Sequence, residues 1–106
     1  MIFVFLDDST LDVVSEKDNL CSKYEGIDVE NGVYEFFDEG LHKMIPEFRT
    51  QNERAFLGIV SGQYELRATD VDRNSFLSRL AKVSSVNPNS WFKNVDDIRR
   101  FATEKG

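Results

Sequence analysis

The sequence lacks most of the residue groupings by which enzymes and metal proteins are recognised. Its 106 residues include one cysteine, Cys21, and one histidine, His42, which excludes an internal disulfide and a Cys/His metal cluster. No glycine-rich phosphate loop is present. The apolar run MIFVFL at the start is too short for a membrane span or a signal-peptide core. We therefore expect no cofactor, no membrane segment and a cytoplasmic location.

Negative charge, in contrast, is abundant and unevenly distributed. Residues 1–53 hold 13 Asp and Glu against 4 Lys and Arg, a net charge of −9, whereas residues 54–106 hold 6 against 9, a net charge of +3. A nucleic-acid partner requires a basic surface, so the acidic half argues against one. It favours a basic protein partner that is attracted by electrostatic steering.

The hydrophobic pattern of the first half predicts strands and one short helix. Ile2–Leu6 is typical of a strand buried on both faces, and the polar residues that follow it suggest a loop. Ser15 is placed to start a short helix that ends at Gly26. Val33–Asp38 and Lys43–Arg49 read as a hairpin turning at Glu39-Gly40, and Pro46 predicts an edge or a bulge in its second strand.

The second half predicts two more strands and two helices. Arg54–Val60 has apolar residues on both faces and reads as a central strand, which a tight turn at Ser61-Gly62 joins to the alternating strand Gln63–Thr69. Asp72–Ser84 has an apolar side and a basic side, and Asn94 is placed to cap a last helix. The expected fold is a single α+β domain over residues 1–106. It has an antiparallel β-meander of about five strands, with one short N-terminal helix and two C-terminal helices packed on it.

Few residues are suited to catalysis. Asp7 and Asp8 end the first strand and, with His42, are the residues from which a small metal-dependent hydrolase would be built. His42 would otherwise need Asp38 or Glu39 to bind a metal. The Gly58–Gly62 stretch lacks the G-x-S-x-G spacing of a nucleophile elbow. We expect no enzyme activity and no metal site.

The stretch Asp28–Gly40, DVENGVYEFFDEG, is the strongest candidate for a binding surface. It contains five carboxylates, three aromatic residues and no lysine or arginine. A strand from Val33 would place aromatic residues on both faces, and aromatic side chains exposed beside charges are typical of interfaces. The predicted partner-binding residues are Asp28, Glu30, Tyr34, Glu35, Phe36, Asp38 and Glu39. Tyr34 and Phe36 or Phe37 would provide the aromatic anchor.

The stretch GIDVENGVYEFFDEG and the following HKMIPEF resemble segments of the immunity proteins of bacterial toxin systems, in particular contact-dependent growth inhibition. The likeness extends from Gly26 to about Thr69 and concerns acidic and aromatic character rather than a shared motif. It implies a non-catalytic protein that binds and neutralises a cognate toxin domain, often a basic nuclease, and it carries over no site residue.

The leading hypothesis is therefore an acidic immunity or inhibitor protein, present as a monomer or weak homodimer. One alternative is a structural or regulatory subunit that makes contact through the basic side of the penultimate helix, formed by Arg73, Arg79 and Lys82. Its acidic half could pair with that side in a homodimer. The other alternative is the metal-dependent hydrolase based on Asp7, Asp8 and His42.

Overall fold

The computed structural model describes residues 1–55, 58–60 and 62–104, and for 53–55 and 58–60 it describes the backbone. Its main element is a six-stranded sheet with the strand order β7-β4-β3-β1-β2-β8. These strands are β1 (Ile2–Phe5), β2 (Thr10–Val14), β3 (Glu35–Asp38), β4 (His42–Phe48), β7 (Tyr64–Val71) and β8 (Ser85–Val86). All neighbours are antiparallel except β2 and β8, which are parallel. The sheet is therefore mixed.

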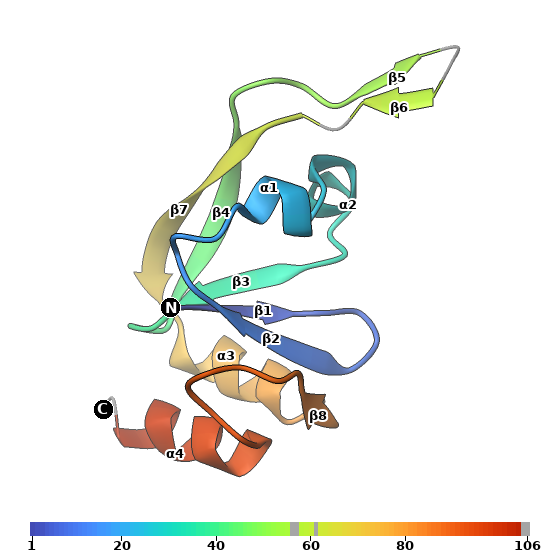
Figure 1. Cartoon of the computed structure of the whole chain (residues 1–106). Helices are drawn as coiled ribbons and strands as arrows, with labels where there is room; N and C mark the ends of the chain where they lie inside the picture. The colour runs from blue at the N-terminus through green and yellow to red at the C-terminus, as the bar shows by residue number, and fades with distance from the viewer. Residues whose placement is uncertain (56–57, 61, 105–106) are drawn as a thin grey trace.

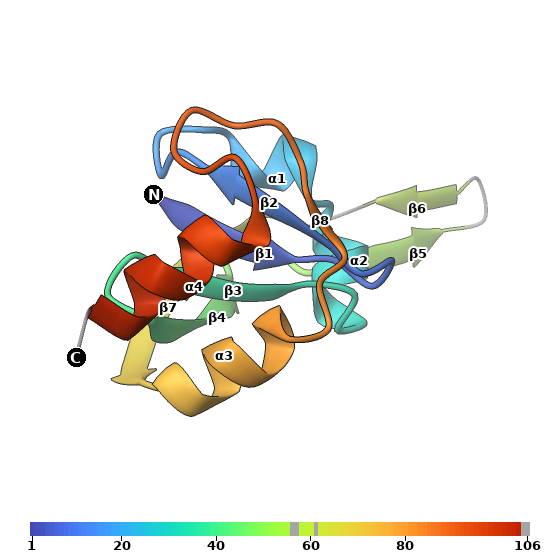
Figure 2. The ribbon, with the colours of Figure 1, turned by 90° about the horizontal axis from the view of Figure 1, so that it is seen from below.

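Helices lie on both faces of this sheet. The short helices α1 (Leu20–Lys23) and α2 (Gly26–Glu30) lie on one face. The longer helices α3 (Arg73–Leu80) and α4 (Val95–Glu104) lie on the other, in front of the sheet in Figure 2. Figure 1 shows the resulting three layers edge-on. The predicted α+β class is confirmed, although the helices form two layers and the sheet has one parallel pair.

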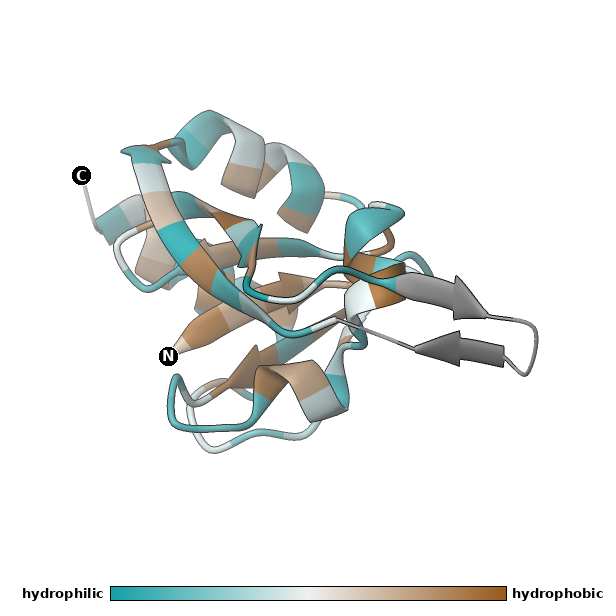
Figure 3. Ribbon diagram, turned by 90° about the horizontal axis from the view of Figure 1, so that it is seen from above, coloured by the Kyte–Doolittle hydropathy of each residue, from teal (hydrophilic) through white to brown (hydrophobic). Residues whose placement is uncertain are grey.

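Strand β1 is the centre of both cores because its side chains alternate between the two faces. All four of its residues are buried, and β1 is brown along its length in Figure 3. Phe3 and Phe5 point to the α3–α4 side, where Phe76 of α3 contacts both rings at centroid distances of 5.0 and 5.4 Å. We call this side the phenylalanine core. Its remaining buried members are Leu11, Val13, Phe37, Leu41, Leu80, Ile98 and Ala102.

The opposite core, under α1 and α2, contains two tyrosines. Tyr64 donates a hydrogen bond of 2.7 Å from its hydroxyl to the carbonyl of Tyr24, and Tyr24 donates one of 2.5 Å to Asp12 Oδ2. Burial raises the pKa of both hydroxyls, and for Tyr24 the bond to Asp12 raises it further. Both hydroxyls therefore remain donors at neutral pH. We call this side the tyrosine core, and its other buried members are Ile2, Val4, Val14, Val29 and Phe36.

Several elements occur where the sequence pattern placed them. Strands β1 and β7 and the β3–β4 hairpin are confirmed. Helix α3 starts after Asp72, which accepts a hydrogen bond from the Ser75 backbone amide, and Asn94 accepts one from the Asp97 amide at the start of α4. Strand β4 lies between β3 and β7, so it is not an edge, and its irregularity falls between His42 and Met44 rather than at Pro46.

The region between Leu6 and Gly26 differs from the prediction. The stretch expected to be a loop contains β2, whose Leu11 and Val13 enter the phenylalanine core. Ser15 begins a turn rather than a helix, and Asn19 caps the four-residue α1. Gly26 starts α2 instead of ending α1. A Cβ at Gly26 would lie 2.5 Å from the carbonyl oxygen of Gly62, so this close approach requires glycine.

The prediction of a central strand over Arg54–Val60 is wrong. β5 (Glu53–Ala55) pairs antiparallel with β6 (Gly58–Val60), and in the described part of the chain neither strand pairs with the main sheet. Figure 1 shows these two strands extending away from the sheet. The predicted turn at Ser61-Gly62 falls partly outside the described residues, because Ser61 is not among them. Gly58 lies inside the predicted strand, and in the structure it is the first residue of β6.

Candidate functional site

The predicted aromatic anchors are not exposed. β3 is covered on both faces, so that Phe36 lies in the tyrosine core and Phe37 in the phenylalanine core, with exposed fractions of 2% and 0%. The prediction that Phe36 contacts a partner is therefore wrong. Tyr34, two residues earlier, is only half-buried and packs against Tyr24 and Phe36 at centroid distances of 4.9 and 6.2 Å.

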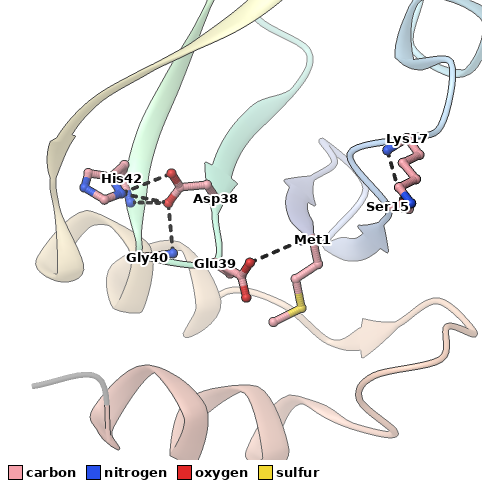
Figure 4. A network of polar contacts seen from close by, with 7 residues as sticks. All are labelled: Met1, Ser15, Lys17, Asp38, Glu39, Gly40 and His42. Atoms are coloured by element: carbon pink, nitrogen blue, oxygen red, sulfur yellow. Dashed lines mark hydrogen bonds and ion pairs between the residues drawn. The ribbon is translucent and has the colours of Figure 1, made fainter.

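The carboxylates of β3 and its turn bind groups of the same chain. Glu35 lies 3.1 Å from Arg79 Nε. Asp38 lies 3.0 Å from His42 Nδ1 and accepts hydrogen bonds from the Gly40 and His42 backbone amides, which closes the turn (Figure 4). Glu39 lies 3.8 Å from the amino group of Met1. These three predicted binding residues thus stabilise the hairpin and its contacts.

A different set of carboxylates acts on Tyr34 through its charge. Burial raises the pKa of its hydroxyl, and the negative charges of Asp28, Asp7, Glu25 and Asp12, in decreasing order, raise it further. We call Tyr34 and these four carboxylates the acidic face. It retains Asp28 and Tyr34 from the predicted set and adds three residues from elsewhere in the sequence.

The fold explains why these residues meet. Helix α2 ends at Glu30, and Gly32, two residues later, has a φ of 75°. The Val33 amide donates back to the Asp28 carbonyl, so the chain reverses and brings Tyr34 near α2. Phe5 of β1 pairs with Glu35 of β3, so that the β1–β2 turn containing Asp7 lies beside the start of β3.

The β1–β2 turn itself is held by a short polar network. Asp8 accepts hydrogen bonds from both the backbone amide and the hydroxyl of Thr10, and these bonds lower the pKa of the Asp8 carboxyl. Leu6 donates its backbone amide to the Thr10 carbonyl at 3.0 Å. Asp7 therefore lies in a hydrogen-bonded turn.

The charges before and after residue 31 differ in how they are compensated. Residues 1–30 contain eight carboxylates and two basic residues, Lys17 and Lys23. Among the described residues, every ion pair uses a carboxylate at position 35 or later. Glu30, also predicted to bind a partner, is exposed and accepts a hydrogen bond from the Asn52 side-chain amide. No ion pair between described residues therefore uses a carboxylate of the first thirty residues.

The hydrolase hypothesis is wrong for the residues on which it was based. Asp7 and Asp8 follow the carboxyl end of β1, whereas His42 follows Asp38, which pairs with Ile2 at the other end. The three side chains therefore lie at opposite ends of a strand. In the described part of the chain, no group of three or more His, Cys, Asp or Glu side chains is arranged to hold a metal ion.

The basic side predicted for the penultimate helix is reduced. Arg79 points toward the sheet, where it pairs with Glu35 and lies with its guanidinium 5.4 Å from the centroid of Phe5. Arg73 is half-buried, which leaves Lys82 as the fully exposed member of the three. In a homodimer that pairs this side with the acidic half, Arg79 would therefore not be available to contact the second copy.

The residues that complete the acidic face lie far from Tyr34 in the sequence, so the sequence pattern did not indicate that they belong with it. Asp7 and Asp12 lie 27 and 22 positions before Tyr34, on a turn and on a strand that was not predicted. The signal available was β2 itself, where Thr10, Val13 and Val14 are β-branched.

Comparisons with known proteins add no relative: a scan against protein-family models and searches of curated proteins and solved structures returned no match. Among the described residues, no helix is both long enough and apolar enough to cross a membrane.

Proposed function

We propose that this chain is a non-enzymatic binding module, an acidic immunity or inhibitor protein that binds and neutralises a basic partner in the cytoplasm. The observation that supports this proposal best is the acidic face, where the charges of four carboxylates act on a half-buried tyrosine and none of the four forms an ion pair with a described residue. These carboxylates can still bind positively charged groups, and the aromatic ring of Tyr34 beside them adds contact area.

The acidic face would act at two stages of binding. During approach, uncompensated carboxylates attract a basic surface and raise the association rate, an effect that salt weakens. After contact, a lysine or arginine of the partner would lie between these carboxylates and the Tyr34 ring, since aromatic rings bind cations on their faces. A stable complex of this kind buries about 1,600 Å² in total. Occlusion of the partner's own active surface would then neutralise it.

The test compares two charge reversals of equal size at different places. Asp7→Lys with Asp28→Lys changes the acidic face, and Asp96→Lys with Asp97→Lys changes α4 on the far side of the sheet. The partner is the basic protein encoded beside this gene or co-purified with the native chain at low salt. Stopped-flow association is measured between about 20 and 500 mM salt, a range over which screening becomes nearly complete.

The acidic-face variant is expected to associate at least about tenfold more slowly at low salt and to lose most of the salt dependence. The α4 variant is expected to change the rate by a much smaller factor. Equal effects of the two variants would mean that net charge alone is sensed, and an unchanged rate in the acidic-face variant would overturn the proposal.

A further inference from the structure

A pocket opens on the same side of the sheet as the acidic face, but at the other end of β1. It has a volume of about 410 Å³ and lies between α1, with the turn before it, and strands β4 and β7. Its lining consists of Ile2, Glu16, Asp18, Asn19, Leu20, Cys21, Asp38, Met44, Tyr64, Glu65 and Leu66. None of the residues of the acidic face lines it, so the two features are separate.

The pocket exists because α1 is too short to cover the sheet. The helix has four residues, none of them fully buried, and both Leu20 and Cys21 contact Tyr64 of β7. Cys21 Sγ lies 3.3 Å from the Tyr64 carbonyl oxygen and 3.5 Å from its backbone nitrogen. Met44 and Leu66 of the neighbouring strands stay half-buried beyond this contact. An apolar floor is therefore open to solvent beside the helix.

The rim of the pocket is negative. Four carboxylates line it, those of Glu16, Asp18, Asp38 and Glu65, and no lysine, arginine or histidine is found among its described lining residues. Two of the four already have a partner in the chain, since Asp38 lies 3.0 Å from His42 Nδ1 and Glu65 pairs with Arg49. Glu16 and Asp18 have no cationic partner among the described residues, and Asp18 accepts only the Ser15 backbone amide.

We propose that this pocket receives a lysine or arginine side chain of the basic protein partner. Such a side chain has an apolar stem and a charged end, and it binds best where an apolar surface is bordered by opposite charge. The stem would lie on Ile2, Met44 and Leu66, and the charged group would reach Glu16 and Asp18. A purely apolar side chain would bring the unpaired carboxylates of Glu16 and Asp18 out of water without compensating them, which is costly.

This inference rests on the proposed function for the identity of the partner, but its test does not require the partner. The probe is Nα-acetyl-lysine N-methylamide, and its neutral counterpart is Nα-acetyl-norleucine N-methylamide, which has the same alkyl chain without the ammonium group. Each is titrated into the full chain at low salt, and backbone amide shifts are followed by two-dimensional NMR.

The lysine derivative is expected to shift the amides of Leu20, Cys21, Tyr64 and Leu66 along saturable curves, while the norleucine derivative shifts them weakly or not at all. Equal binding of the two derivatives, or shifts that avoid these amides, would overturn the proposal. Binding of a free diamine such as cadaverine without binding of the peptide-like probe would also overturn it, because the pocket would then take a small molecule rather than a protein side chain.

Substitutions place the effect in the pocket. Glu16→Gln with Asp18→Asn keeps the side-chain shapes, and the Asn oxygen can still accept from Ser15, but the two free charges are lost. We expect the dissociation constant of the lysine probe to rise about threefold to tenfold. The matched control, Asp7→Asn with Asp28→Asn, removes the same charge from the acidic face and is expected to leave probe binding nearly unchanged.

The two proposals can fail separately. Loss of pocket binding with an intact acidic-face effect on partner association would remove the pocket proposal alone. Saturable pocket binding without any acidic-face effect would leave a cation pocket whose partner binds elsewhere.

Discussion

The two sides of the central sheet differ in the length of the helices that cover them and in the composition of their cores. On one side, helices of eight and ten residues close an entirely apolar core of packed phenylalanine rings. On the other side, helices of four and five residues cover a core that includes buried hydroxyl groups. The acidic face and the pocket both belong to the second side.

If the proposed function holds, this difference separates the side that stabilises the fold from the side that binds the partner. The α3–α4 side buries large rings against β1 and makes ion pairs that balance its carboxylates. The α1–α2 side leaves apolar surface and carboxylates exposed, which lowers stability and is the surface that we propose for a partner. Breaking each side in turn should therefore give effects of different size and kind.

The largest effect is expected from Phe76→Ala in the phenylalanine core. Phe76 is fully buried and contacts Phe3, Phe5 and Phe37 with centroid distances between 5.0 and 5.4 Å. We expect the free energy of unfolding to fall by about 3–5 kcal/mol, measured by urea denaturation at low temperature. Tyr34→Ala, a ring truncation on the other side, is expected to lower it by less than half as much, because Tyr34 is half-buried. Similar losses for both would contradict the proposed division.

The next largest effect is expected from Tyr24→Phe in the tyrosine core. Its hydroxyl donates to the Asp12 carboxylate, and a hydrogen bond to a charged group contributes about 1.5–3 kcal/mol. Asp12 keeps its second donor, the Asn87 side-chain amide, so we expect a loss near the lower end of that range. Tyr34→Phe is the control, because the structure shows no hydrogen bond from the Tyr34 hydroxyl to a described residue. A similar loss in this control would mean that the hydroxyl–carboxylate bond is unimportant.

The residues that cap α3 and α1, on opposite sides of the sheet, predict that only the cap of α3 makes the stability of the fold depend on pH. Helix α3 is capped by Asp72, whose pKa is lowered by its hydrogen bonds to Ser75, whereas α1 is capped by the uncharged Asn19. Because the folded-state pKa of Asp72 lies below the unfolded value, its contribution is present above the unfolded pKa and is lost as the pH falls through the folded pKa.

Asp72→Asn keeps a capping oxygen but does not titrate. We therefore expect little change in stability at pH 7 and a shallower loss of stability in acid, below about pH 4, when urea midpoints are measured across pH. If the stability of this variant falls in acid as steeply as that of the native chain, the titration of Asp72 is not linked to folding.

The sequence pattern predicted the elements whose periodicity and caps agree. Strand β1 is a continuous apolar run, and α3 and α4 have apolar faces with Asp72 and Asn94 at their starts. Strand β2 was missed because Asp12 interrupts its apolar residues, and that carboxylate is explained by its tertiary hydrogen bonds from Tyr24 and Asn87. The two-residue β8 has no sequence signal, since it forms by pairing with β2.

The sequence predicted that the candidate binding surface would be acidic and aromatic, but it did not identify all the residues that form it. The acidic-aromatic stretch did indicate where charge gathers, yet a strand covered on both faces buries Phe36, and Glu35 and Asp38 find partners that lie elsewhere in the chain or one turn away. Asp7 and Glu25 join Tyr34 only through the sheet order and the reversal at Gly32. Contacts of this kind depend on topology, which periodicity does not specify.

The smallest effect should also have opposite signs on the two sides of the sheet. Asp7→Asn with Asp28→Asn removes repulsion among uncompensated carboxylates, so we expect a small rise in the thermal midpoint at low salt. Asp96→Asn with Asp97→Asn removes the ion pairs with Arg99 and Arg100, so the midpoint is expected to fall slightly. Both changes should fade as salt rises from about 20 to 500 mM, because screening weakens attraction and repulsion alike. Thermal unfolding followed by circular dichroism measures both, and a fall in midpoint for the first pair would show that the acidic face is compensated within the chain and has no spare negative charge to offer a partner.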